Sequence, residues 1–289
     1  MKLFSKRTDT FNYQQQRICV TCASSFTGKY CGVCGEKVLE PGEKSFVDFL
    51  AGVVNAFTFL DGKFAKSFRL MLVRPGGFSK AFSYGIRQPY MKPVSLFFVA
   101  NFIFFLFPFA TSNTFSTPLK YQPNMQLYGK SAEELISAKV VADNISFDEL
   151  AVLYQQQSNS LAKLLMVVMV LLFAIPLMIL NYRKHLYLAD HLYLSFEFNA
   201  FFIFVNMILL STLVGILFLL PVRSAFINDV FFSRVFALTT FYFLLRAQSE
   251  FYAQRWWVAI TKSIVLTFSL QYVFSAYKGI LFYITMWTI

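Results

Sequence analysis

The stretch 161–180 reads LAKLLMVVMVLLFAIPLMIL, and Lys163 is its only charged residue. An α-helix needs about 20 predominantly apolar residues to cross the hydrocarbon core of a bilayer. The stretch therefore predicts a transmembrane helix, with Pro176 inside it. Proline is tolerated in membrane helices because neighbouring groups satisfy the freed backbone carbonyl. This segment decides the class of the fold, and comparable runs lie on both sides of it.

The composition of the whole chain agrees with that class. Of its 289 residues, 57% are hydrophobic and 37 are phenylalanine. Mean hydropathy is +0.54. A soluble domain is nearer 45–50% apolar, so the chain is expected to be a polytopic membrane protein. The net charge of +11 lies beside apolar runs, which favours an anionic membrane surface as its partner over nucleic acid.

Four further apolar runs predict an all-α fold with about five transmembrane helices. The first and fourth runs are short, and the third and fifth are long enough to tilt. Trp256, Trp257 and Trp287 stand near helix ends, as interfacial aromatic residues do. The predicted spans are 94–110, 161–180, 192–220, 230–245 and 258–286, which make up a transmembrane domain over 94–289.

The distribution of charge predicts the sidedness. Residues 1–92 carry fourteen Lys or Arg and six Asp or Glu, whereas residues 111–160 carry three and five. Cytoplasmic segments are enriched in Lys and Arg, so the N-terminus is expected inside and 111–160 outside. Met1 to Gln16 is a polar tail with no apolar signal region. The expected location is a bacterial cytoplasmic (inner) membrane.

The four cysteines of the chain form two CxxC pairs, Cys19–Cys22 and Cys31–Cys34, separated by eight residues. Two such turns can close a tetrahedral site of four sulfurs, which predicts a small zinc-ribbon over residues 17–40 with structural Zn²⁺. A cytoplasmic N-terminus keeps thiols reduced. Disulfides or redox thiols remain the alternative.

Residues 45–92 alternate aromatic and basic side chains at helical spacing. Phe46, Phe49 and Phe57 share one face of a segment that is too short to span a bilayer. Two interpretations stay open: in-plane interfacial helices, or a small helical layer packed beneath the spans. The cations expected at the membrane surface are Lys63, Lys66, Arg69, Arg74, Lys80, Arg87 and Lys92.

The external segment is expected to contain two short helices. Ser131 with Glu134, and Ser146 with Glu149, each pair a hydroxyl with a carboxylate three residues later. This spacing is typical of a capping box at a helix start. The second helix would continue into the span at Leu161.

The third span carries polar residues. At 100° per residue, His191, Ser195, Asn199 and Asn206 fall within about 80° of one another, whereas Glu197 lies off this stripe. Glu197 could pair with Arg183 or Lys184. The stripe either handles a proton or ligand, or supplies hydrogen bonds between helices while His191 sits wet at the interface.

Catalytic patterns are not found. The sequence contains no nucleophile elbow, P-loop, HExxH helix or Rossmann glycine pattern, and an enzyme is not predicted. Arg17, Lys29 and Lys37 make a thin basic footprint for nucleic acid, which is not an expected partner.

A set of local motifs carries a family resemblance. It comprises Cys34-Gly35-Glu36, Arg74-Pro75-Gly76, Tyr84-Gly85-Ile86-Arg87, Tyr90, Pro93, Asp190-His191 and Phe201. With these residues the chain resembles an uncharacterised bacterial domain-of-unknown-function family, number three-six-six-seven, of zinc-ribbon polytopic membrane proteins. In that family histidines often occupy the positions of Glu197 and Asn199, and only His191 matches. The resemblance therefore implies the architecture, and the departure at Glu197 and Asn199 argues against a metal or haem site on this span, which the family's histidine pattern would otherwise suggest.

Two functional hypotheses follow. The first is a scaffold or assembly protein, with a protein partner or a second copy of itself. The alternative is a transporter or lipid-handling protein that uses the polar stripe of the third span.

Overall fold

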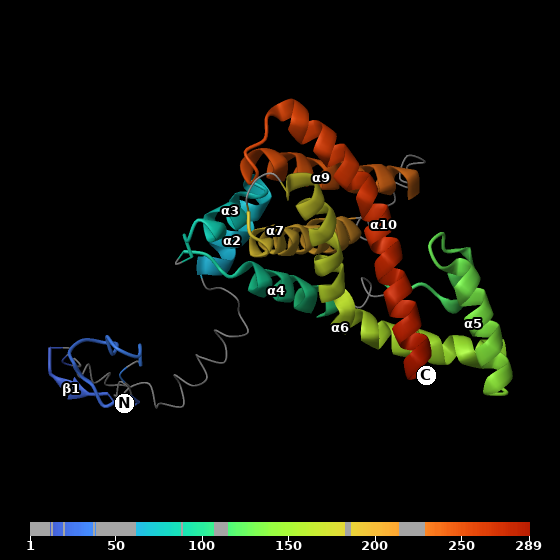
Figure 1. Cartoon of the computed structure of the whole chain (residues 1–289), viewed down its shortest axis with the longest axis horizontal. Coiled ribbons are helices and arrows are strands. Elements are labelled where there is room, and N and C mark those ends of the chain that lie inside the picture. Colours follow the sequence, from blue (N-terminus) through green and yellow to red (C-terminus); the bar gives the residue numbers. More distant parts are fainter. Residues whose placement is uncertain are drawn as a thin grey trace, which may run out of the picture. The chain divides into compact units, whose positions relative to one another are not determined.

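A computed structural model of the protein (Figure 1) describes residues 12–38 except 13, 20 and 37. It also describes residues 62–289 except 88, 107–114, 183–185 and 214–228. The chain divides into two compact units, Met1–Asp61 and Gly62–Ile289. The expected amphipathic helix over residues 45–60 lies outside the described residues.

The described part of the first unit holds two very short strands, β1 (Arg17–Ile18) and β2 (Ser25–Phe26). They pair antiparallel, with Arg17 opposite Phe26 and Ile18 opposite Ser25. The first CxxC turn links them and the second follows β2. A two-stranded ladder of this size is not stable alone in water, so the cysteine cluster must contribute to holding it.

The stretch quoted first lies in a single long helix, α6 (Phe147–Asn181). The capping box at its start is confirmed: Glu149 N donates to Ser146 Oγ at 3.3 Å, and Ser146 N donates to Glu149 Oε2 at 2.9 Å. The helix continues into the apolar run, as the sequence predicts.

Three helices among the described residues are long and apolar enough to cross a membrane. They are α6, the continuous helix Leu188–Leu213, and α10 (Trp256–Thr288). The second comprises α7 (Leu188–Phe201), a π-helical turn η5 (Phe202–Leu209) and four further residues. The first expected span is a shorter apolar helix, α4 (Pro93–Leu106), and the fourth lies in α9 (Asp229–Glu250). The count of five spans stays a prediction.

The basic aromatic segment forms α2 (Gly62–Val73) and α3 (Gly77–Ser83). Met71 and Phe78 are fully buried in the main core, and Phe68 packs on Phe204 with ring centroids 4.9 Å apart. Such burial is what a packed helical layer predicts. The exposed face carries six of the seven expected membrane-surface cations, and Lys80 is half-buried.

The segment before α6 forms a second, smaller core. It comprises a 3₁₀ helix, η3 (Leu119–Asn124), and α5 (Gly129–Ala142). Tyr128, Tyr154 and Phe282 pack together there, so this layer joins the start of α6 to the end of α10. We call it the outer layer.

One expected helix start is wrong. Ser131 lies inside α5, and Tyr128 precedes the helix without a side-chain cap. The helix begins earlier because the turn after η3 supplies the backbone acceptor: Gly129 N donates to Met125 O at 2.8 Å.

Candidate functional site

The four cysteines converge. Their sulfur atoms all lie within 4.8 Å of one another. Cys19 Sγ is 3.4 Å from Cys34 Sγ, and Cys22 Sγ is 3.7 Å from Cys31 Sγ. A covalent S–S bond is about 2.05 Å. Four sulfurs at about 2.3 Å from a tetrahedral zinc ion lie about 3.8 Å apart. The spacing therefore suits a shared metal ion, and all four cysteines are free thiols.

The two CxxC turns share one backbone pattern. Ala23 N donates to Cys19 O and Gly35 N donates to Cys31 O, both at 2.9 Å. The residue after each turn has a left-handed backbone, with φ of 56° at Ala23 and 77° at Gly35. Because the same turn occurs twice, both pairs of sulfur atoms point toward the centre of one cluster.

The Ser24 hydroxyl favours thiolate at Cys22 and Cys31, whereas contact with Cys19 and burial raise the pKa of the Cys34 thiol. Ser24 Oγ lies 3.2 Å from Cys31 Sγ and 2.9 Å from Cys22 Sγ. The Ser24 hydroxyl is the main cause that lowers the pKa of the Cys31 thiol to about 6. Thiolate is the form that binds metal, so the turn is prepared for a cation.

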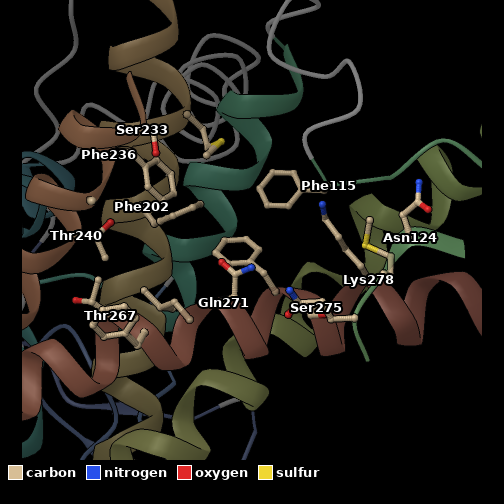
Figure 2. Close-up of a pocket in the computed structure, with 17 residues that line it drawn as sticks. Phe115, Asn124, Phe202, Ser233, Phe236, Thr240, Thr267, Gln271, Ser275 and Lys278 are labelled. Carbon is tan, nitrogen blue, oxygen red and sulfur yellow. The ribbon is translucent and has the colours of Figure 1, made fainter. Parts of the chain in front are cut away.

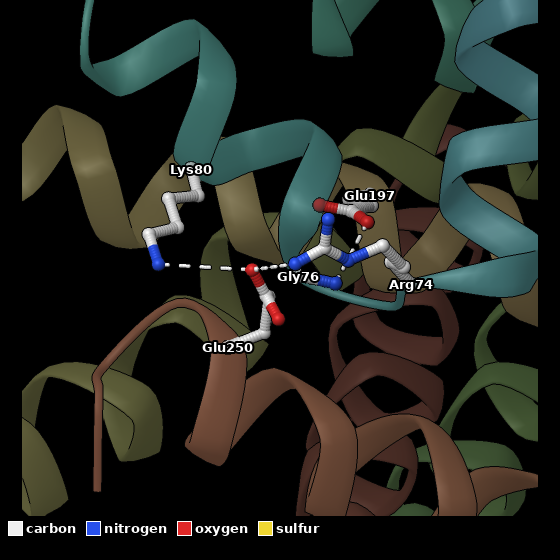
Figure 3. A network of polar contacts seen from close by, with 5 residues as sticks. All are labelled: Arg74, Gly76, Lys80, Glu197 and Glu250. Carbon is white, nitrogen blue, oxygen red and sulfur yellow. Dashed lines mark hydrogen bonds and ion pairs between the residues drawn. The ribbon is translucent and has the colours of Figure 1, made fainter.

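The second site surrounds a buried carboxylate. Glu197, on α7, has no exposed surface. Its Oε1 accepts from Gly76 N at 2.9 Å and its Oε2 from Ser79 N at 2.8 Å, as Figure 3 shows for the Gly76 contact. Among the described residues these amides have no other acceptor, and they lie at the start of α3, where a helix favours negative charge. Glu197 thus acts as the cap that α3 lacks in its own sequence.

The loop before α3 leaves no room for a side chain. Gly76 has φ +82°, and a Cβ there would lie 2.8 Å from the Cα of Ala247 on α9. Beyond this contact, Glu250 Oε1 lies 3.0 Å from Arg74 Nη2 and 3.6 Å from Lys80 Nζ (Figure 3). Two of the cations expected at the membrane surface are therefore paired with a carboxylate.

The predicted partners of Glu197, Arg183 and Lys184, lie outside the described residues. The sequence identified Glu197 but not its role. One feature of the sequence could have indicated that role. The helix that begins at Gly77 follows Gly76, so it has no hydroxyl, Asp or Asn at its N-cap and needs a cap from elsewhere in the chain.

His191 is buried rather than wet. It is 2% exposed, and its Nδ1 lies 2.8 Å from Tyr252 Oη. Burial raises the pKa of the Tyr252 hydroxyl, so the phenol stays neutral. The neighbouring Asp190 accepts a hydrogen bond from Ser83 of α3. This end of α7 is thus attached to α3 and to the segment after α9.

The other stripe residues face different helices. Ser195 Oγ donates to Val170 O on α6 at 2.6 Å, and Asn206 Oδ1 accepts from Thr239 Oγ1 on α9 at 2.6 Å. Asn199 Nδ2 donates to Ser195 O within the same helix at 2.8 Å. The stripe supplies hydrogen bonds within and between helices, which fits the second interpretation of these residues.

A cavity of about 670 Å³ lies elsewhere, among η5, α9 and α10 (Figure 2). None of the five polar residues expected to form an intramembrane site lines it. Its volume is within the range of ligand pockets, about 300–1,000 Å³. Its lining includes Phe115, Phe202, Phe236, Phe274, Gln271 and Lys278.

These features define a mostly helical protein with membrane-compatible helices and a cluster of four cysteines near its N-terminus. Residues 61–105 match the model of a family described as "Protein of unknown function (DUF3667)". The matched segment contains Arg74-Pro75-Gly76 and Tyr84–Arg87, and it confirms the resemblance drawn from the sequence. Comparison with curated proteins and with solved structures gave no match.

Proposed function

We propose that the protein is a bacterial inner-membrane scaffold whose cytosolic N-terminal unit binds Zn²⁺ structurally and recruits a protein partner. The observation that carries the proposal is the spacing of the four sulfurs, 3.4 and 3.7 Å within the two closest pairs. Four thiolates fill a tetrahedral zinc ion and leave no position for a substrate. The metal would then stabilise the fold of the N-terminal unit, and the surface of that unit would contact the partner.

Apolar side chains around the cluster support a recruiting surface. Ile18, Tyr30 and Val33 are 74%, 57% and 76% exposed. Ile18 precedes Cys19, and Val33 lies inside the second CxxC turn. Exposed apolar groups held by a metal-bound turn are suited to contact with another protein.

Metal analysis of the purified full chain tests the site. The parent should carry about one zinc ion per chain, and a Cys19→Ser, Cys22→Ser variant should lose it. A Thr27→Ala variant, which changes an exposed side chain outside both CxxC turns, serves as the control. Undiminished zinc in the double cysteine variant would refute the metal site.

A separate variant tests the recruitment. Ile18→Ser with Val33→Ser keeps the four cysteines and should retain zinc. It should lose any partner that co-purifies with the parent in mild detergent. Absence of a stable partner, or its retention by this variant, would argue against the scaffold.

The alternative, a transporter or lipid-handling protein using the stripe, predicts that His191→Ala and Asn199→Leu abolish flux with the fold intact. The buried contacts of His191 with Tyr252, and of Asn199 with Ser195, favour a loss of thermal stability instead. Melting curves of both variants in detergent separate the two outcomes.

A further inference from the structure

We propose that the cavity among η5, α9 and α10 binds a single-chain amphiphile with an anionic head group. Its head would lie at Lys278 and its hydrocarbon chain would run along α10 toward Thr267. This site is independent of the cysteine cluster and of the proposed scaffold role. Figure 2 shows the Lys278 side chain rising from α10 and ending beside the ring of Phe115, which lines the same cavity.

The position of Lys278 along the membrane normal follows from its neighbours. Gly279 lies against the ring of Tyr128, and Phe282 packs in the outer layer. The outer layer carries exposed Lys130 and Glu133, so it lies in water. On the other side, Tyr277 Oη donates to Ala162 O at 3.2 Å, where the apolar run of α6 begins. Lys278 therefore marks the boundary between water and hydrocarbon, where lipid head groups lie.

Lys278 is a half-buried cation without a carboxylate partner among the residues that the structure describes. The other lysines of the apolar helices differ. Lys262 Nζ donates to Asn181 Oδ1 at 2.9 Å, and Lys163 Nζ lies 5.4 Å from the Phe105 ring. A charge near hydrocarbon is costly and is usually paired, so an anionic group at Lys278 would complete the site.

The shape of the cavity fits one acyl chain. Thr267, Gln271, Phe274 and Lys278 recur on one face of α10 at spacings of three and four residues. Lys278 lies eleven positions after Thr267, about 16 Å along the helix. This is close to one leaflet, half of the roughly 30 Å hydrocarbon core.

Polar and aromatic side chains line the cavity along its whole length, with Ser233, Thr240 and Thr267 at the end away from Lys278. Ser275 and Asn124 line the cavity with Lys278 and offer donors to a head group, with Gln271 about two turns further in. Aromatic rings of η5 and α9 face α10. The ring centroid of Phe202 lies 5.1 Å from that of Phe236 on α9 and 5.4 Å from that of Phe274 on α10. Phe202 and Met207 come from η5, and π-helical turns are frequent at binding sites. Among the described residues of this lining Lys278 is the single charged one, and five phenylalanine rings line the same cavity, which suits an anionic head group joined to an apolar chain.

Binding of labelled oleate and of 1-oleoyl lysophosphatidate to the purified full chain in neutral detergent tests the proposal. Saturable binding of at least one of them is expected, and the tighter ligand tells carboxylate from phosphate recognition. Monooleoylglycerol has the same chain without charge and should bind at least tenfold more weakly. Equal binding of the neutral lipid, or no saturable binding of either anion, would overturn the proposal.

Matched variants locate the site. Lys278→Gln should weaken binding at least tenfold, whereas Lys163→Gln removes a lysine at the same level outside this cavity and should leave binding unchanged. Ala237→Phe fills the cavity from α9 and should block binding while keeping Lys278. Equal losses in the two lysine variants would mean attraction by surface charge alone. Melting curves show that each variant is folded.

Discussion

The two carboxylate oxygens of Glu197 are the only acceptors, among the described residues, that the structure gives to the Gly76 and Ser79 amides. A leucine at 197 would leave both amides buried without an acceptor, at about 1–3 kcal/mol each. We therefore expect Glu197→Leu to lower the free energy of unfolding by roughly 2–5 kcal/mol. The measurement is thermal unfolding of the purified variant in detergent.

Glu197→Gln and Glu133→Leu are the matched controls for that prediction. Glutamine keeps one carbonyl oxygen as an acceptor. The free energy of unfolding of Glu197→Gln should therefore lie between those of the parent and of Glu197→Leu. Glu133 is exposed on α5, and its replacement should change little. An unaltered melting temperature for Glu197→Leu would contradict the capping role.

A pair of glycines separates backbone strain from close contact. Gly76 and Gly85 have φ of +82° and +85°, but a Cβ at Gly85 meets nothing within 4 Å, whereas at Gly76 it would lie 2.8 Å from Ala247 Cα. Gly85→Ala should cost about 1–2 kcal/mol, the left-handed penalty alone. Gly76→Ala should cost at least about 2 kcal/mol more, because α3 and α9 must separate. Equal melting temperatures would show that the contact is unimportant.

At the scale of elements, the capping boxes of α5 and α6 show what local patterns can predict. The pattern at Ser146 is correct because nothing before it competes for the helix start. The same pattern at Ser131 is wrong because η3 and the following turn place the N-cap of α5 at Tyr128, three residues earlier. Ser146→Ala should therefore cost about 1 kcal/mol, and Ser131→Ala close to nothing, in the same unfolding assay. The reverse order would show that α5 begins at Ser131.

The candidate sites also divide into one that local sequence spacing predicts and others that depend on tertiary packing. The CxxC spacing predicts the cysteine cluster, because four ligands on two turns of the chain need little else. Helical periodicity places His191, Ser195 and Asn206 on one face of the helix Leu188–Leu213. Their partners, Tyr252, Val170 and Thr239, follow from tertiary packing. The cavity at Lys278 could not be predicted either, because its walls come from segments that only the folded chain brings together.

At the scale of the molecule, the exposed surface of the long helices is apolar. Leu164, Ile179 and Phe268 are 75%, 62% and 71% exposed. Such side chains along α6 and α10 are expected to contact acyl chains. We predict that the purified protein aggregates when detergent is removed and is recovered by lipid nanodiscs, as followed by light scattering. A monodisperse protein in plain buffer would contradict the membrane assignment.

Sidedness is a separate prediction of the same scale. A single cysteine at Lys139, on α5, should react with an impermeant maleimide in intact cells. A single cysteine at Lys66, on α2, should react only after lysis. Both positions need a background in which the four native cysteines are serine. Labelling of position 66 in intact cells would reverse the topology.

The contacts of α3 also constrain how the polypeptide is made. The amides of Gly76 and Ser79 bond to the carboxylate of Glu197, which lies 121 and 118 positions further along the chain. The partner of Arg74, Glu250, lies 176 positions further along. At elongation rates of roughly 5–20 residues per second, the ribosome needs on the order of 10 s to deliver Glu197. During that interval α3 lacks its cap, and it can take its final position only after the helix that carries Glu197 has formed.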